Sequence, residues 1–293
     1  MAENALLTSI EQQDWLQPGA ERTSELIRNT FQSAGERGQT VKNALHGVWL
    51  GHPLHPAITD VPVGSWTVAA ALDLLEIRGD SNYQSGADFA VLLGLLTAVP
   101  AAITGATDWS DTQGKPQRVG AVHGMLNLGA ATLYAGSLAA RRAERRGIGK
   151  ALGFLGFGLV LISAYLGGEL SYTRRVGVNH APDVDEELPK EYTVAIAESE
   201  LVQGEPKKVN VAGTDVFFLK TATKLYALAN KCSHMGGPLA EGKVEGDSVI
   251  CPWHGSRFCL GDGRVEDGPA TNNQPVFDVK IEAGNVLIRA RQA

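Results

Sequence analysis

Cysteine is scarce in this chain of 293 residues, which contains only three. So few cysteines in a chain of this length do not suggest a disulfide framework. A basic excess is also lacking, because the formal net charge is −6. A surface that binds phosphates usually carries an excess of lysine and arginine, so nucleic acid is not expected as a partner. No basic stretch followed by an apolar run opens the sequence, and we expect no cleavable signal peptide.

The chain instead has a strong asymmetry in hydropathy. Residues 1–45 are polar and carry interleaved charges, whereas four apolar segments follow one another within residues 46–173. Each segment is about as long as is needed to cross a ~30 Å hydrocarbon core. A soluble bundle of buried helices is the alternative, but such helices normally keep a polar face, which the last three segments almost lack. We predict an all-α four-helix transmembrane bundle. The segments are 61–77, 89–107, 119–140 and 148–170.

The last third of the chain has a different periodicity. A charged linker over residues 174–191 precedes short apolar runs in residues 192–293. Glycine, asparagine and aspartate separate these runs, a pattern typical of short strands joined by turns. The sequence therefore predicts a second, all-β domain over residues 192–293.

Two short boxes in this β region combine cysteine with histidine. Cys232 and His234 form a Cys-x-His box, and Cys251 and His254 form a Cys-x-x-His box. Thiolate and imidazole are good ligands for transition metals. A structural zinc site would use all four groups, but zinc fingers usually pair cysteine with cysteine and histidine with histidine. One ligand of each kind from each loop better suits a [2Fe–2S] cluster with two different irons.

The segments CSHMGGPL, CPWHGSRF and DGRVEDGPA resemble the Rieske ferredoxin module, over about residues 192–290. The resemblance implies that Cys232 and Cys251 bind one iron, and that His234 and His254 bind the other. It also implies that the loop 268–270 covers the cluster.

The sequence departs from the high-potential Rieske proteins at several positions. Gly236 and Trp253 stand where those proteins have a disulfide that clamps the two loops, and Phe258 stands where they have a tyrosine. Ser256 remains, and the resemblance implies that it donates to a bridging sulfide. Hydrogen bonds to sulfur raise the potential, so losing one implies a low-to-intermediate value within roughly −150 to +300 mV. Cys259 is expected to be a packed side chain.

The β domain is expected to carry electrons rather than to form a complete oxygenase. A Rieske oxygenase needs a second iron site, typically two histidines and a carboxylate. Only His180 lies in this part of the chain outside the two boxes. The expected partner is a redox protein that donates or accepts electrons.

The segment GVWLGHPLHPAITDVPVGSW resembles a bacterial family of predicted four-helix membrane proteins of unknown function, marked by HPLHP. His52 and His55 belong to this signature, and His123 lies in the third apolar segment. An ionisable residue inside a membrane is by default a functional candidate. Histidines on two helices suit haem b, and one histidine suits a hydrogen bond to a quinone. Structural roles are the third alternative.

These features predict a multi-pass protein of the bacterial cell membrane. The loop AARRAERRGIGK is basic and belongs in the cytoplasm by the positive-inside rule. With four spans, both termini and the Rieske domain would lie outside, although Arg174 and Arg175 favour the opposite orientation. Three functions remain open: electron exchange between the cluster and a haem or quinone in the bundle, a tethered ferredoxin for a soluble oxidoreductase, and a redox sensor.

Overall fold

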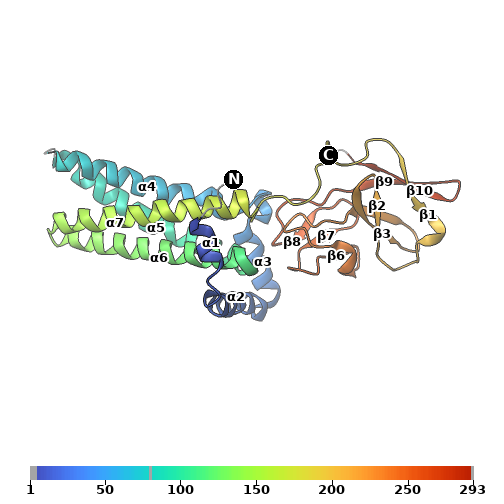
Figure 1. Ribbon diagram of the computed structural model, residues 1–293, viewed down its shortest axis with the longest axis horizontal. Helices are drawn as coiled ribbons and strands as arrows, with labels where there is room; N and C mark the ends of the chain where they lie inside the picture. The colour runs from blue at the N-terminus through green and yellow to red at the C-terminus, as the bar shows by residue number, and fades with distance from the viewer. Residues whose placement is uncertain (1–4, 79–80, 292–293) are drawn as a thin grey trace. The chain divides into compact units, whose positions relative to one another are not determined.

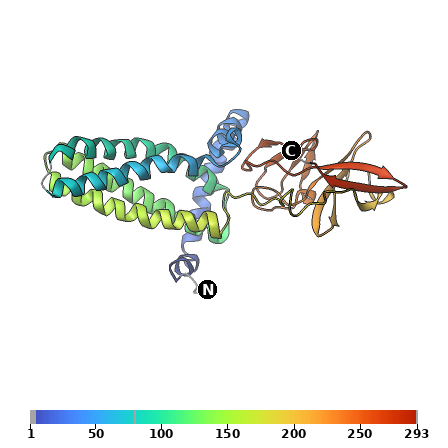
Figure 2. The same ribbon diagram turned by 90° about the horizontal axis from the view of Figure 1, so that it is seen from above.

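The computed structural model describes residues 5–78 and 81–291. Figures 1 and 2 show a helical part followed along the chain by a β part. The internal contacts define two compact units. One unit contains residues 1–38 and 54–176, and the other contains residues 39–53 and 177–293.

Helices make up the described N-terminal region. Short 3₁₀ turns at Val48–Leu50 (η1) and Ser81–Tyr83 (η2) precede two of the long helices, and a π-helical turn at Glu169–Thr173 (η3) continues the last one. The seven α-helices are α1 (Ala5–Glu11), α2 (Leu16–Ser33), α3 (Gly35–His46), α4 (Leu54–Ile77), α5 (Gln84–Ser110), α6 (Gly114–Arg142) and α7 (Arg146–Gly168).

Three helices among the described residues are long and apolar enough to cross a membrane. They are α4, α5 and the continuous helix Arg146–Thr173. The predicted count of four spans is not confirmed, because α6 is absent from this set. Polar side chains such as Gln117, Asn127 and Arg141 lie along α6 and lower its mean hydropathy. It nevertheless runs beside the three apolar helices, and Figures 1 and 2 show all four side by side.

The four long helices pack through small and aromatic side chains. Trp66 on α4 stacks on Tyr134 of α6, with ring centroids 4.3 Å apart. Alanines and valines such as Ala69, Val91 and Ala130 fill the space around the two rings. Large apolar side chains remain exposed on the outer faces, which is the surface that a hydrocarbon environment accommodates. They include Val68, Phe89, Leu96, Leu128 and Leu155.

The N-terminal helices α1 and α2 pack against one end of this bundle, near the turn between α5 and α6, and Leu7 of α1 is buried against Val119 and Leu166. Gln117 accepts a hydrogen bond from Gln17 (2.8 Å) and donates one to Ser24 (2.8 Å). Arg28 donates to the carbonyl of Ser110, and Arg118 pairs with Asp14. The N-terminal segment thus folds against the bundle through side-chain hydrogen bonds of α2 and an apolar contact of α1.

The β part contains three small sheets. Their orders are β1-β10-β9, β2-β3-β4 and β5-β6-β7-β8, with antiparallel neighbours throughout. The strands are β1 (Thr193–Ala197), β2 (Lys207–Val211), β3 (Thr214–Lys220), β4 (Leu225–Ala229), β5 (Lys243–Glu245), β6 (Ser248–Ile250), β7 (Arg257–Cys259), β8 (Val265–Asp267), β9 (Phe277–Glu282) and β10 (Asn285–Ala290).

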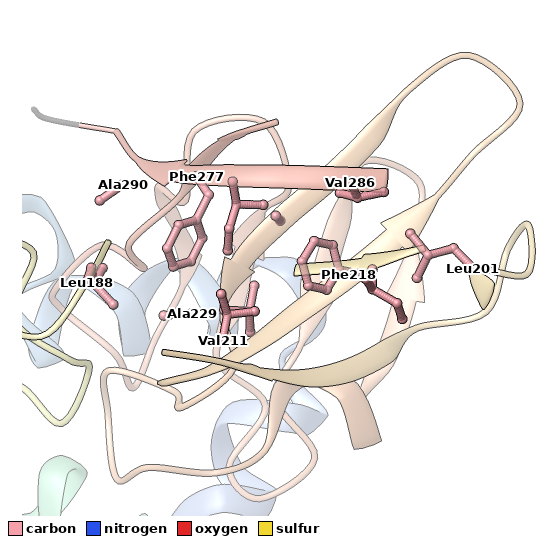
Figure 3. Close-up of a cluster of buried hydrophobic side chains, with 12 residues drawn as sticks. Leu188, Leu201, Val211, Phe218, Ala229, Phe277, Val286 and Ala290 are labelled. Atoms are coloured by element: carbon pink, nitrogen blue, oxygen red, sulfur yellow. The ribbon is translucent and has the colours of Figure 1, made fainter. Parts of the chain in front are cut away.

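Strand β3 separates two apolar cores. Successive side chains of a strand point to opposite faces, so Val216 and Phe218 enter one core while Phe217 and Leu219 enter the other. Figure 3 shows the first core, with Phe218 and Phe277 between the sheets. The second core contains Cys232 and Cys251. The two predicted cysteine ligands therefore lie in a buried apolar core.

Candidate metal centre

The two cysteine–histidine boxes form turns with the same hydrogen bonds. In the first turn, the Cys232 N–H donates to Gly237 O (2.9 Å) and the Gly236 N–H donates to Cys232 O (2.9 Å). In the second turn, the Cys251 N–H donates to Ser256 O (2.8 Å) and the Gly255 N–H donates to Cys251 O (3.1 Å). Two loops of one design therefore present one cysteine and one histidine each.

Glycine allows the backbone to adopt the conformation of these two turns. Gly236 and Gly255 both have φ of +78°, in the left-handed region that side chains with a Cβ rarely occupy. Gly237 brings the first loop close to the second, because a Cβ at this residue would lie 2.7 Å from the Cys251 sulfur.

The four predicted metal ligands converge. The imidazole rings of His234 and His254 lie with centroids 5.0 Å apart, at an interplanar angle of 89°. Cys232 and Cys251 are buried in the same apolar core, and each thiol shifts the pKa of the other. The histidines are half-buried, so they lie closer to solvent than the cysteines do. Across the described residues, no three His, Cys, Asp or Glu side chains gather as a single-ion site.

The two thiols have different proton affinities. The hydrogen bond from Cys232 lowers the pKa of Cys251 to about 7, with further help from the backbone N–H groups of Trp253 and His254. The same hydrogen bond, together with burial, raises the pKa of Cys232. Backbone N–H groups of His234 and Met235 also point at the Cys232 sulfur. The thiolate, the form that binds metal, is therefore favoured at Cys251, whereas at Cys232 only the two backbone N–H groups favour it.

The donor set fits a [2Fe–2S] cluster. Its thiols pair with each other and its imidazoles pair with each other, which is how a Rieske cluster distributes two cysteines on one iron and two histidines on the other.

Two buried polar residues support the loops. Ser256 is fully buried, and its hydroxyl accepts a hydrogen bond from the Ala270 N–H at 3.0 Å. Gln274 was not singled out from the sequence. Its side-chain oxygen accepts from the Ser233 N–H (3.0 Å), while its amide donates to the carbonyls of Ala229 and Lys231 (2.6 and 2.7 Å). Only the fold reveals this role, because no local motif marks a lone glutamine.

Phe258 and Trp253, at which the sequence departs from the high-potential Rieske proteins, lie in different environments. Phe258 on β7 is fully buried in the core that holds the cysteines and offers no hydroxyl. Trp253 is 55% exposed, and its ring lies 6.4 Å from that of His254. Cys259 is a free, half-buried thiol at the end of β7, outside both loops.

The histidines of the HPLHP signature separate in the structure. His52 is exposed, and its Nδ1 lies 3.1 Å from the carbonyl oxygen of Pro53. His55 on α4 and His123 on α6 come together, with ring centroids 6.4 Å apart. Nδ1 of His55 bonds Ala101 O (2.9 Å), and Nδ1 of His123 bonds Ser163 O (2.8 Å).

The two loops lie within a segment that matches a known protein family. Residues 191–278 match the Rieske [2Fe-2S] domain. The naphthalene 1,2-dioxygenase system ferredoxin component of Pseudomonas aeruginosa is 31% identical over 101 residues, which are 34% of this chain and 97% of that protein. The chain belongs to the Rieske [2Fe-2S] domain family. Along the chain, the Rieske domain follows a helical region. Residues 51–180 match a predicted membrane protein family (DUF2231).

Other relatives match between a quarter and a third of this chain. Apoptosis-inducing factor 3 of Mus musculus is 37% identical over 91 residues, which are 31% of this chain and 15% of that protein. The oxygenase component of 3-ketosteroid-9-alpha-monooxygenase of Rhodococcus rhodochrous is 47% identical over 73 residues, 25% of this chain and 19% of that protein. Among solved structures, the ferredoxin of carbazole 1,9a-dioxygenase from Nocardioides aromaticivorans is 24% identical. It has a TM-score of 0.32, with 34% of this chain and 98% of that chain covered.

Proposed function

We propose that this protein is a membrane-anchored electron carrier whose Rieske domain exchanges electrons with a redox partner. The observation that carries the proposal is the pair of matching loops, which bring Cys232 and Cys251 together in the core and His234 and His254 together near its surface. The family match of the helical region and its three apolar helices support anchoring in a membrane. The curated ferredoxin relatives, which are components of dioxygenase systems, support electron transfer.

The residues of the Rieske domain would divide the work between holding the cluster and meeting a partner. When bound, a [2Fe–2S] cluster takes up or releases one electron at a time. Cys232 and Cys251 would hold one iron in the buried core. His234 and His254 would hold the other, with their half-buried rings toward solvent. The exposed ring of Trp253 beside His254 offers an apolar contact to the partner on the same side.

The full-length protein in detergent should contain iron and acid-labile sulfide in equal amounts and should take up one electron per chain. Metal analysis together with a reductive titration followed in the visible spectrum measures both quantities. Zinc in place of iron, or iron without sulfide, would contradict the proposal. Reduction by one electron without oxidation by any redox protein or quinone would favour the redox sensor instead.

A second candidate function concerns His55 and His123, because they are ionisable side chains between largely apolar helices. Each ring bonds a backbone carbonyl through Nδ1, so Nδ1 carries the proton and Nε2 is the acceptor. Gly105 makes room for the pair, since a Cβ there would lie 2.7 Å from His55 Cε1. Asn127 lies 3.1 Å from Nε2 of His123 and would have to leave for a haem iron to bind that nitrogen. These contacts favour a quinone over haem b.

The substitution H55L should slow electron exchange between the cluster and a water-soluble quinone by roughly a hundredfold, the lower range for losing a positioned proton acceptor. Stopped-flow spectroscopy at the cluster absorbance measures the rate. The matched control is H52A, because His52 is exposed. Equal rates of electron exchange in H55L and H52A would mean that the helices serve only as a membrane anchor. Sharp haem bands in the reduced-minus-oxidised spectrum would show that the helices bind haem and would contradict the quinone assignment.

The distribution of basic residues around α7 favours a Rieske domain on the extracytoplasmic side. The basic turn between α6 and α7 belongs in the cytoplasm by the positive-inside rule, and α7 then leads across the membrane to residue 177. Protease digestion of the β domain in intact cells, compared with inverted vesicles, tests this orientation.

A further inference from the structure

A segment that precedes the first apolar helix packs against the Rieske domain. Residues 39–53, which include the C-terminal part of α3 and η1, belong to the same compact unit as residues 177–293. Val48 packs against the buried side chains that include both cysteines, and His46 is 1% exposed. This segment lies outside residues 191–278, which match the Rieske domain. The β domain here therefore carries an additional element.

Asn43 on α3 joins this segment to the end of β8 by two hydrogen bonds. Its Nδ2 donates to Asp267 Oδ1 at 2.8 Å, and its Oδ1 accepts from the Gly268 N–H at 2.9 Å. The Asn43 amide thus donates to a side-chain carboxylate and accepts from a backbone N–H at the same time. Asp267 is also paired with Arg257 on β7, with Nε–Oδ2 at 3.5 Å.

The Gly268 N–H that binds Asn43 belongs to the loop 268–270. This loop is connected to the second ligand turn by a hydrogen bond. Ala270 is 1% exposed and packs in the same core as the cysteines. Its N–H donates to the buried hydroxyl of Ser256, two residues beyond His254. Gly268 lies close to the added segment, because a Cβ there would be 3.2 Å from Val48 Cγ2 and 3.3 Å from His46 Cδ2. A continuous set of contacts therefore runs from Asn43 through the loop to Ser256.

We propose that Asn43 is a positioning residue of the Rieske site, which fixes the loop 268–270 and through it the Ser256 hydroxyl. This inference rests on the proposed function. Because the Ser256 hydroxyl accepts from the Ala270 N–H, its own proton remains available for another acceptor, and we infer that this acceptor is a sulfur of the cluster, since Ser256 closes the turn of Cys251. A hydrogen bond to sulfur raises the cluster potential, and a loop that excludes water protects the cluster. Releasing the loop should weaken both effects.

The variants N43A and N43D test the inference in the full-length protein. N43A removes both hydrogen bonds, and N43D places two carboxylates against each other. Both should lower the midpoint potential and accelerate cluster loss to a chelator by about tenfold, as expected for one or two net hydrogen bonds. Amide hydrogen exchange at Gly268 and Ala270 should accelerate as well. V41A is the matched control, because Val41 is 51% exposed on the same helix.

A double variant separates positioning from general damage to the fold. N43D/D267N exchanges the amide and the carboxylate, so both hydrogen bonds can re-form, whereas D267N alone places two amides together and reports the loss of the Arg257 contact. The double variant should recover the potential and slow exchange relative to N43D. An unchanged potential and unchanged exchange in N43A would overturn this inference alone. A wild-type chain without iron and sulfide would overturn the proposed function, and this inference with it.

Discussion

The substitution H254A should abolish the electron paramagnetic resonance signal of the reduced Rieske cluster. His254 is half-buried beside His234, and these are the two imidazoles that converge in the β domain. Removing one of two protein ligands leaves an iron with a single imidazole and an open position. The signal typical of two histidine ligands should therefore vanish, and iron and sulfide should be lost on purification. Low-temperature spectroscopy of the reduced full-length protein, together with metal analysis, measures both.

The control for this substitution is C259A. Cys259 is a free thiol at the end of β7, outside both ligand turns. We expect this variant to keep the full signal and the wild-type iron content. A Rieske signal that survives in H254A would show that another residue binds the iron. Loss of the signal in C259A would mean that the assignment of the two cysteine ligands is incomplete.

The two candidate ligand loops could be located from the sequence because all the determinants of their turns are local. The ligands, the glycines at positive φ and the hydrogen bonds that close each turn lie within six residues, from Cys232 to Gly237 and from Cys251 to Ser256. Short runs with turn residues between them were also enough to indicate the all-β domain. The comparisons confirm that this domain is a Rieske domain.

Residues that act at a distance could not be predicted in this way. Asn43 is polar and lies on a polar helix, so nothing local distinguishes it from its solvated neighbours; only the fold brings it to Gly268. Gln274 is hidden for the same reason. The predicted count of four spans is not confirmed, because periodicity marks a helix but not its surroundings. Helix α6 packs beside α7 although its ends carry charged residues.

The buried charge network at the end of α4 and α6 gives the second large expected effect. Arg141 is fully buried and pairs with Asp73, which is itself 2% exposed. Arg141 Nη1 also lies 3.0 Å from Asp88 Oδ1, and its Nε donates to Ser137 Oγ at 3.1 Å. The guanidinium thus connects three helices, since Asp73 is on α4, Asp88 on α5 and Arg141 on α6.

The substitution R141M should lower the free energy of unfolding in detergent by roughly 3–5 kcal/mol, because it leaves the Asp73 carboxylate buried without its cation. Thermal and denaturant unfolding followed by circular dichroism measures the loss. R142A is the matched control, since Arg142 is the exposed neighbour in the same helical turn, and its effect should be small.

The double variant D73L/R141M distinguishes the uncompensated charge from the loss of packing. Replacing both members of a buried ion pair by apolar residues of similar size is often neutral or stabilising, so the double variant should recover most of the stability lost in R141M. A loss below about 1 kcal/mol in R141M, the range of an exposed pair, would mean that water reaches Asp73 in the folded protein. Equal losses in R141M and the double variant would instead assign the effect to packing around Ser137 and Gly149, which the Arg141 side chain contacts.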